Sequence, residues 1–309
     1  MTVKRLISCN ASDILGFNAS ELKQSIKASE GRVILSETIV IKEPLVGDIT
    51  DAEVAKSAGA DLILLNMFDV FNSRILGLYP NEETLQTAKI HSDAVNRLRN
   101  LVGRPVGANL EPLSKDTKLM SNQEQLTPGR SATVETFQAA ASLGLDFILL
   151  TGNPGVGTDN AAIVKALKEA KQYFPGIIMV GKMHSAGVDE PIGDVKSITE
   201  FIEAGADVVL VPAVGTVPGF TEADLTSIVQ LAHLHDTLVC SAIGTSQEGS
   251  STSVIENMAI RNKICGVDIQ HIGDSGFSGV APVENIYTMS QAIRGKRHTL
   301  SMIARSVLR

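Results

Sequence analysis

A fourfold repeat constrains the fold of this 309-residue chain more than any other feature of its sequence. Each copy consists of a glycine, one further residue, an aspartate and a short apolar run, and the copies begin at Gly59, Gly144, Gly205 and Gly266. Glycine suits the first position because a helix commonly ends at a residue with positive φ. Dense apolar runs are typical of parallel strands covered on both faces. The repeat therefore predicts four helix-to-strand junctions.

The spacing of the repeat predicts how many strands the chain holds. The last three glycines are separated by 61 residues each, and because one βα unit needs roughly 30 residues, each interval has room for two units. Further strands are expected at 32–41, 105–111, 177–184 and 237–243. Eight alternating strands and helices predict a closed (β/α)8 barrel. An open doubly wound sheet is the alternative, but Ser36-Glu37-Thr38 stands where its glycine fingerprint is expected.

The barrel accounts for the whole chain as one domain over 1–309. We expect an N-terminal helical cap over 1–30, eight βα units over 31–280 and a C-terminal helix over 281–309. Asn18, followed three residues later by Glu21, matches a capping box, and the cap is expected to close the N-terminal face of the barrel. The stretch 291–309 has five Lys or Arg and no acid, which favours a solvated helix or a contact in a homo-oligomer. The other helices are expected at 82–101, 134–143, 160–173, 197–204, 222–235 and 253–263.

Charge and cysteine content exclude several classes of function. The chain has 27 Lys and Arg against 34 Asp and Glu, a formal charge of −7, so it lacks the positive field that nucleic-acid binding requires. Its apolar runs are too short to span a membrane, and no signal peptide is recognisable. The three cysteines are far apart and show no zinc spacing. We expect a cytoplasmic protein.

Polar residues at the C-terminal ends of barrel strands are predicted to converge on one pocket. Lys182 and His184 share one side of their expected strand because side chains alternate, and a carboxylate, a lysine and a histidine in one pocket favour acid–base catalysis. Lys182 is alternatively a Schiff-base residue or a structural partner of an interior glutamate, Glu37 or Glu111. Catalytic roles are predicted for Lys182, His184, Glu111 and Glu37, and substrate contacts for Asn66, Asn109, Asn153, His271 and Asp274.

A phosphorylated ligand and a divalent metal ion are both candidates for binding at the face that carries the predicted catalytic residues. The small-residue loops after the seventh and eighth strands favour a phosphate or phosphosugar, although the charge of Asp274 suits a sugar hydroxyl better. No cofactor is required by the sequence, but Mg²⁺ or Mn²⁺ is a candidate ligand of Glu37, Asp69, Glu111 and His184. The loop residues concerned in phosphate binding are Gly244, Thr245, Ser246, Asp274, Ser275 and Gly276.

The interval between the first two repeats holds the longest loops. It spans 85 residues, 24 more than the others, and the surplus lies at 67–81 and 112–133, after the second and third strands. Loops of this length are commonly lids or binding segments. Lys115, Lys118 and Arg130 predict that the second of them closes over an anion; a mobile surface loop is the alternative.

The segments 59–69, 105–110 and 146–150 resemble the BtpA/SgcQ family of barrel proteins. The shared pattern is the glycine, acid, apolar run and Asn66-Met-Phe-Asp69 of the second strand, together with Pro-Val-Gly-Ala-Asn at 105–109. The resemblance covers roughly residues 31–215. It implies a (β/α)8 barrel that acts as a nucleosidase or as an assembly factor.

The combined hypothesis is a small-molecule metabolic enzyme that acts on a phosphorylated or sugar-containing metabolite. Lyase or isomerase chemistry is favoured because the expected pocket holds a lysine but no nucleophilic Ser or Cys arrangement. A nucleosidase-like hydrolase, with or without a metal, is the second hypothesis. The third is a non-catalytic barrel with an assembly or regulatory role, because fold alone does not fix function.

Overall fold

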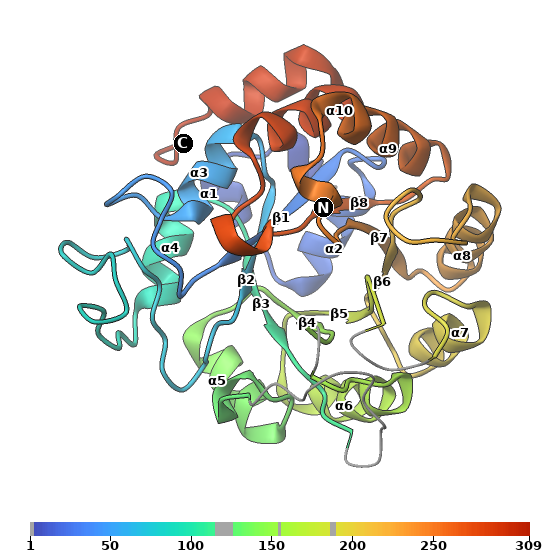
Figure 1. Ribbon diagram of the computed structural model, residues 1–309, viewed down its shortest axis with the longest axis horizontal. Helices are drawn as coiled ribbons and strands as arrows, with labels where there is room; N and C mark the ends of the chain where they lie inside the picture. Colours follow the sequence, from blue (N-terminus) through green and yellow to red (C-terminus); the bar gives the residue numbers. More distant parts are fainter. Residues whose placement is uncertain (1–2, 115–125, 154–155, 186–189) are drawn as a thin grey trace.

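The structure, a computed structural model, describes residues 3–114, 126–153, 156–185 and 190–309 (Figure 1). Eight parallel strands close into a barrel in chain order, with the last strand paired to the first. The predicted (β/α)8 barrel is therefore confirmed. The strands are β1 (Val33–Ile39), β2 (Leu62–Asn66), β3 (Val106–Leu110), β4 (Phe147–Leu150), β5 (Ile177–Gly181), β6 (Val208–Pro212), β7 (Leu238–Ile243) and β8 (Ile269–Ile272).

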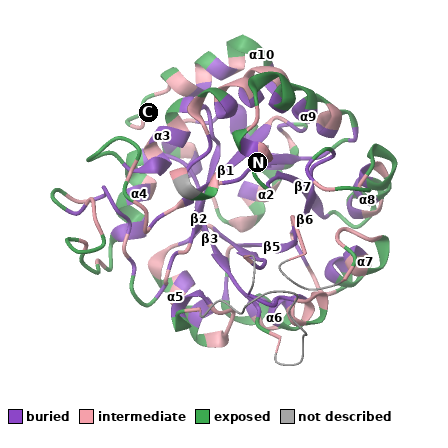
Figure 2. Cartoon of the chain, viewed as in Figure 1, coloured by how far each residue is buried: buried purple, intermediate pink, exposed green. Residues whose placement is uncertain are grey.

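A ring of helices surrounds the barrel, and Figure 2 shows their buried faces turned toward the strands. α10 has a kink at Gly295, where φ is +73°. No helix in the described ranges is both long and apolar enough to cross a membrane. The helices of the ring are α3 (Asp51–Ala58), α4 (Ala94–Val102), α5 (Val134–Leu143), α6 (Asn160–Tyr173), α7 (Val195–Glu203), α8 (Glu222–Leu234), α9 (Thr252–Ile264) and α10 (Val283–Ala304).

The helix expected over 82–101 is shorter than predicted, because it begins only at Ala94. The prediction was wrong for 82–93, where side-chain contacts hold a loop instead. Glu82 is buried; its carboxylate accepts the Lys89 amide at 3.0 Å and lies 3.0 Å from His91 Nε2. The His91 ring stacks on Tyr79 at 3.7 Å between centroids. The buried carboxylate of Glu82 therefore holds this segment as a loop, and its hydrogen bonds replace those that a helix would form.

The N-terminal extension packs against the inside of the barrel. It consists of a short 3-10 turn (Leu6–Ser8), α1 (Ala11–Ile14) and α2 (Ala19–Lys27). The predicted capping box is confirmed, since the side chains of Asn18 and Glu21 each accept the other's amide. Apolar residues of the extension join one cluster with strand residues such as Val33 and Leu62. This cluster fills the N-terminal end of the barrel and leaves the C-terminal end for a site.

The aspartates of the repeat tie the strands together in pairs. The Asp61 amide donates to the carbonyl of Ile34 at 2.9 Å, and the Asp61 carboxylate accepts the amide of Ile34 at 2.9 Å. The other three copies form the same two-bond ring across β3–β4, β5–β6 and β7–β8, through the pairs Asp146–Val106, Asp207–Ile178 and Asp268–Val239. Each carboxylate therefore fixes the register of an odd strand against the following even strand.

Each repeat aspartate also binds a cation outside the barrel. Asp61 pairs with Arg294 of α10, and Asp146 pairs with Arg99 of α4. Asp268 lies 2.9 Å from His233, so this histidine at the end of α8 contacts a structural carboxylate near the strand starts. The hydrogen bond to Asp268 raises the pKa of His233. The glycines of the repeat all have positive φ and follow the helix ends as predicted.

Candidate active site

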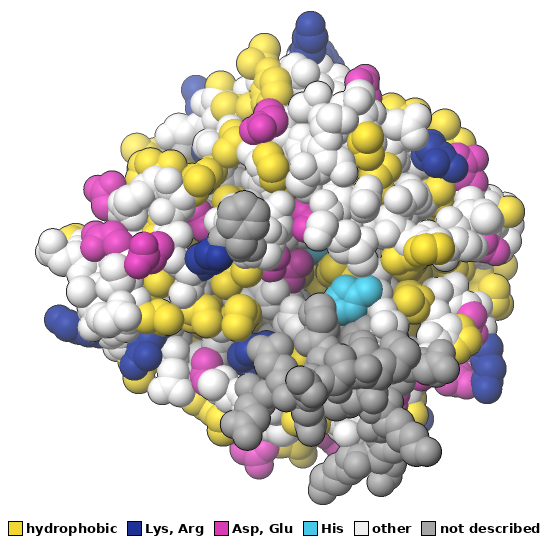
Figure 3. Space-filling model, in the orientation of Figure 1, with side chains coloured by type: hydrophobic (Ala, Val, Ile, Leu, Met, Phe, Trp, Pro, Cys, Tyr) yellow, Lys and Arg dark blue, Asp and Glu magenta, His cyan; other side chains and the backbone are white. Residues whose placement is uncertain are grey.

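A cavity of about 760 Å³ opens at the C-terminal ends of the strands. A histidine and acidic side chains lie at the centre of this face in Figure 3. Its walls come from strands β1 to β3 and from the segments that follow β2, β3, β4, β5, β7 and β8. The described polar residues that line it include Glu37, Asn66, Asn109, Arg130, Thr151, Asn153, His184, Thr245, Ser246, Glu248, Asp274 and Ser275.

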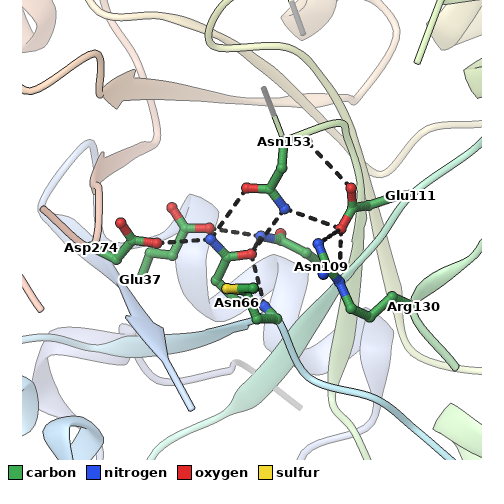
Figure 4. Close-up of polar contacts among 8 residues, drawn as sticks. Glu37, Asn66, Asn109, Glu111, Arg130, Asn153 and Asp274 are labelled. Atoms are coloured by element: carbon green, nitrogen blue, oxygen red, sulfur yellow. Dashed lines mark hydrogen bonds and ion pairs between the residues drawn. The ribbon is translucent and has the colours of Figure 1, made fainter. Parts of the chain in front are cut away.

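Three asparagine side chains form the centre of the site (Figure 4). Asn66 ends β2, Asn109 lies on β3 and Asn153 follows β4. The Asn66 carboxamide oxygen accepts hydrogen bonds from Asn109 Nδ2 at 3.2 Å and from Asn153 Nδ2 at 3.1 Å. The same oxygen accepts the Met67 amide at 2.8 Å. These bonds fix the orientation of all three amides.

The amide network connects three carboxylates on different strands. Asn66 Nδ2 donates to Asp274 at 2.7 Å, and Asn109 Nδ2 donates to Glu37 at 2.6 Å. Asn153 Nδ2 donates to Glu111 at 3.0 Å. The structure therefore brings together the asparagines and carboxylates that the sequence placed at the ends of β1, β2, β3, β4 and β8.

Glu111 is neutralised by an arginine from the loop before α5. Its side chain is 1% exposed, and Arg130 contacts one carboxylate oxygen through two nitrogens, at 2.5 and 3.1 Å. Burial raises the pKa of Glu111, and the guanidinium opposes that rise. The ion pair lies at the edge of the network, so Arg130 both lines the cavity and holds Glu111. Of the basic residues predicted for this loop, Lys115 and Lys118 lie outside the described residues.

We expect Arg130→Met to lower the free energy of unfolding by about 2–3 kcal/mol at pH 8. Glu111 already has a raised folded pKa, so its ionised form is the unfavourable one once Arg130 is gone. The loss of unfolding free energy in Arg130→Met is therefore small below the pKa of Glu111 in the unfolded chain. It grows as pH rises through the pKa of Glu111 in the folded protein. Denaturant melts at pH 4.5 and pH 8 measure this difference, and an added Glu111→Gln change is expected to remove it. Equal losses of unfolding free energy at both pH values contradict the conclusion that Arg130 stabilises ionised Glu111.

Asp274 has the most strongly perturbed carboxyl of the cavity. Burial and the neighbouring Glu37 and Glu248 raise its pKa to about 6, against the hydrogen bonds from Asn66 and Gly276. Burial likewise raises the pKa of Glu248. Groups whose proton affinity is moved toward neutral pH are the usual proton-transfer groups of enzymes. Asp274 thus has the protonation behaviour that a general acid or base requires.

The two histidines of the site differ in position. His184 lines the cavity, and burial lowers its pKa while Glu37 opposes the change. The neutral imidazole is therefore its main form at pH 7. His271 is completely buried on β8, with Nε2 3.2 Å from Glu37 Oε2. Neither ring nitrogen of His271 makes a hydrogen bond within the described part of the chain.

Lys182 is separated from the cavity that the other predicted residues line. Its ammonium forms an ion pair with Glu190 and approaches the carbonyl of Thr158 at 3.4 Å. The predicted pairing with Glu37 or Glu111 is wrong, because those groups bind Asn109 and Arg130. The strand ends at Gly181, whose φ of +144° interrupts the alternation that was expected to place Lys182 beside His184.

Asp69, a candidate metal ligand, also lies apart from the cavity-lining residues. Its carboxylate accepts the amides of Phe71 and Asn72 at 2.9 and 3.0 Å, in a turn after β2. Within the described ranges, no three or more His, Cys, Asp or Glu side chains are grouped as metal ligands would be. The candidate set of Glu37, Asp69 and Glu111 is therefore not assembled in one place.

The loops predicted to bind phosphate line the cavity, but several of their amides are engaged. Gly244 donates to Thr216 Oγ1 at 3.0 Å, and Gly273 donates to the carbonyl of Ile243 at 2.9 Å. Gly276 donates to Asp274 at 2.8 Å. Amides that already have an acceptor contribute little to an anion site. These three glycines shape the turns, while Thr245, Ser246 and Ser275 lie at the cavity surface.

Two charged residues of the site were not predicted as site residues from the sequence. The sequence predicts Arg130 only as part of a basic loop and does not single out Glu248. Glu248 follows β7 and is 6% exposed, and Asn285 of α10 holds its backbone carbonyl at 2.8 Å. The local sequence signal for Glu248 is an acid two residues beyond the loop Gly244–Ser246, and this signal is too common to be specific.

Comparisons with known proteins agree on the fold. The structure matches an archaeal fructose 1,6-bisphosphate aldolase with a TM-score of 0.54 and 13% identity, over 89% of this chain and 99% of the other. A Schiff base forming fructose-1,6-bisphosphate aldolase matches with a TM-score of 0.54 and 14% identity, over 89% and 100%. At such identities the likeness shows the barrel fold alone. No curated protein matches the chain. The model of the family described as "Domain of unknown function (DUF7916)" matches residues 7–309, and the chain belongs to that family.

Proposed function

We propose that this protein is an acid–base enzyme that acts on a small polyhydroxylated metabolite by lyase or isomerase chemistry. The observation that carries the proposal is the amide network that joins Asp274, Glu37 and Glu111 around one cavity. Fixed amides and carboxylates are suited to substrate hydroxyls, because each hydroxyl donates one hydrogen bond and accepts others.

The reaction needs one group that removes a proton from carbon and one that protonates oxygen. His184 is neutral at pH 7 and accepts the carbon-bound proton next to a substrate carbonyl, while protonated Asp274 donates its proton to the carbonyl oxygen. An isomerisation is completed when protonated His184 returns its proton to the former carbonyl carbon while the Asp274 carboxylate takes the proton of the adjacent hydroxyl. An elimination is completed when protonated His184 gives its proton to the β-hydroxyl, which leaves as water, while the Asp274 carboxylate takes back the enol proton and the carbonyl re-forms. Glu37 remains close to both groups and raises the proton affinity of each.

Other chemistries have less support from the site. A Schiff base requires an accessible neutral amine, whereas the Lys182 ammonium is held by Glu190. A phosphate group on the substrate has less support than hydroxyl groups, because the glycine amides and the Thr245 hydroxyl are occupied and Arg130 is paired with Glu111. The nucleosidase or assembly role implied by the BtpA/SgcQ resemblance has only the strand-two and strand-three segments in its favour.

Solvent exchange tests this proposal while the substrate is still unidentified. The purified protein is incubated with a deproteinised cell extract in D₂O, and the metabolites are examined by mass spectrometry. We expect enzyme-dependent deuterium on carbon in a hydroxylated metabolite, and no such label with a His184→Ala variant that retains its fold. A parallel incubation in ¹⁸O-labelled water identifies a hydrolase instead. Labelling from water oxygen alone, or no enzyme-dependent label in either solvent, overturns the proposal.

A further inference from the structure

We propose that the substrate of this cavity carries a protonated amine beside its hydroxyl groups. The inference rests on the proposed function, because it concerns the same site and names the class of molecule that fits there. Two independent features of the cavity support it: the net charge of the lining side chains, and the buried polar atoms that have no hydrogen-bond partner among the described residues.

The balance of charge is negative. Three carboxylates line the cavity, on Glu37, Glu248 and Asp274, in addition to the Glu111–Arg130 pair at its edge. Among the described lining residues, Arg130 is the single Lys or Arg, and its guanidinium is already bound to Glu111. Carboxylates in a partly dry pocket strongly favour a cationic ligand over an anionic one.

The unpartnered polar atoms of three lining residues can all accept hydrogen bonds, and the Thr151 hydroxyl can also donate one. Glu248 Oε2, Asn109 Oδ1 and the hydroxyl oxygen of Thr151 are buried and make no hydrogen bond within the described residues. All three residues line the cavity and are at least nine-tenths buried, at 6%, 3% and 3% exposure. Buried acceptors without donors cost free energy. Glu248 Oε2 and Asn109 Oδ1 can only accept, so a ligand that reaches them satisfies them by donating hydrogen bonds.

The amide donors at the centre of the site are already used. The Nδ2 groups of Asn66, Asn109 and Asn153 each donate to a carboxylate of the network. An anionic ligand therefore meets carboxylates and few available donors, whereas an ammonium offers three donors and a positive charge. An ammonium beside Glu248 and Glu37, with hydroxyls toward the asparagines, satisfies both features of the cavity and leaves Asp274 to carry the transferred proton.

The pH dependence of binding follows from the carboxyl of Asp274. Its pKa of about 6 reflects burial and the nearby carboxylates, and its ionised form adds to the negative charge around an ammonium bound beside Glu248 and Glu37. Binding is therefore expected to strengthen as pH rises from 5 to 7.5. The titratable or charged groups that surround it are Glu37 from β1, Glu111 and Arg130 at β3, His184 after β5, Glu248 after β7 and His271 on β8.

Three small molecules of matched shape test the inference. They are the cation of tris(hydroxymethyl)aminomethane, neutral pentaerythritol and the anion 2,2-bis(hydroxymethyl)propionate, each titrated against the full-length protein by saturation-transfer NMR. We expect the cation to bind about tenfold more tightly than the neutral molecule, and the anion not to bind. Glu248→Gln is expected to weaken cation binding about tenfold, because it removes one carboxylate of the ammonium site.

Glu256→Gln is the matched control, because it removes the same charge from an exposed position on α9. It is expected to leave binding unchanged. Equal binding of the cation and the neutral molecule, preference for the anion, or no binding of any of the three overturns the inference. Deuterium exchange on a neutral or anionic metabolite would in that case still support the proposed function, so the two failures are distinguishable.

Discussion

Asp274→Asn is expected to slow enzyme-dependent deuterium exchange by about 10²–10⁴-fold, the usual contribution of a positioned acid or base. Asparagine keeps an oxygen that accepts from Asn66 but cannot give or take the proton. In the wild type, exchange is expected to change with pH around 6, because the pKa of Asp274 lies at about 6. Protonated Asp274 is the donor, so the rate falls as pH rises through that value.

The variant and the wild type are compared by mass spectrometry after incubation with the same extract in D₂O. Thermal unfolding of both shows whether the fold is kept, since Asp274 also accepts the Gly276 amide at 2.8 Å. Glu248→Asp is a useful second variant because it shortens a neighbouring acid without removing its charge. A loss of less than about fivefold in Asp274→Asn, with the fold intact, contradicts the proton-transfer role.

The barrel was predictable because its information is local and repeated. The helix before each even strand is followed by a positive-φ glycine, and an aspartate ring joins each odd strand to the following even strand, so one short pattern occurs four times. The sequence showed the pattern but not the purpose of the aspartates, since a carboxylate that binds a backbone amide 27 residues earlier leaves no local trace. The loop at 82–93 was mistaken for a helix because a single buried acid, Glu82, determines its shape.

The sequence predicted those parts of the site in which the position of a residue follows from its place at the end of a strand. Glu37, Asn66, Asn109 and Asp274 converge because parallel strands end at the same face. The prediction failed at Lys182, where the backbone at Gly181 departs from strand geometry. Arg130 and Glu248 were missed because loop residues reach the cavity through tertiary packing, which no periodicity records.

Arg294→Met is expected to lower the free energy of unfolding by about 3–5 kcal/mol, because it leaves a buried carboxylate without its cation. The Arg294 and Asp61 side chains are both 0% exposed, with Nη1 and Oδ2 2.6 Å apart. The guanidinium also binds Ser290 and the carbonyl of Gly59, so it connects α10 to the first repeat. Denaturant unfolding followed by circular dichroism measures the loss.

Arg99→Met provides the matched control, since it removes the same kind of partner from the second repeat. The Arg99 and Asp146 side chains are 17% and 11% exposed, so water stabilises the remaining carboxylate and the expected loss is smaller, about 1–2 kcal/mol. The four aspartate rings are alike in backbone geometry but differ in the burial of their cation partners. If both variants lose the same stability, burial of the Arg294–Asp61 pair adds nothing beyond what the partly exposed Arg99–Asp146 pair contributes, and the prediction is contradicted. A larger loss for Arg294 shows instead that α10 closes the barrel by neutralising the one repeat carboxylate that water cannot reach.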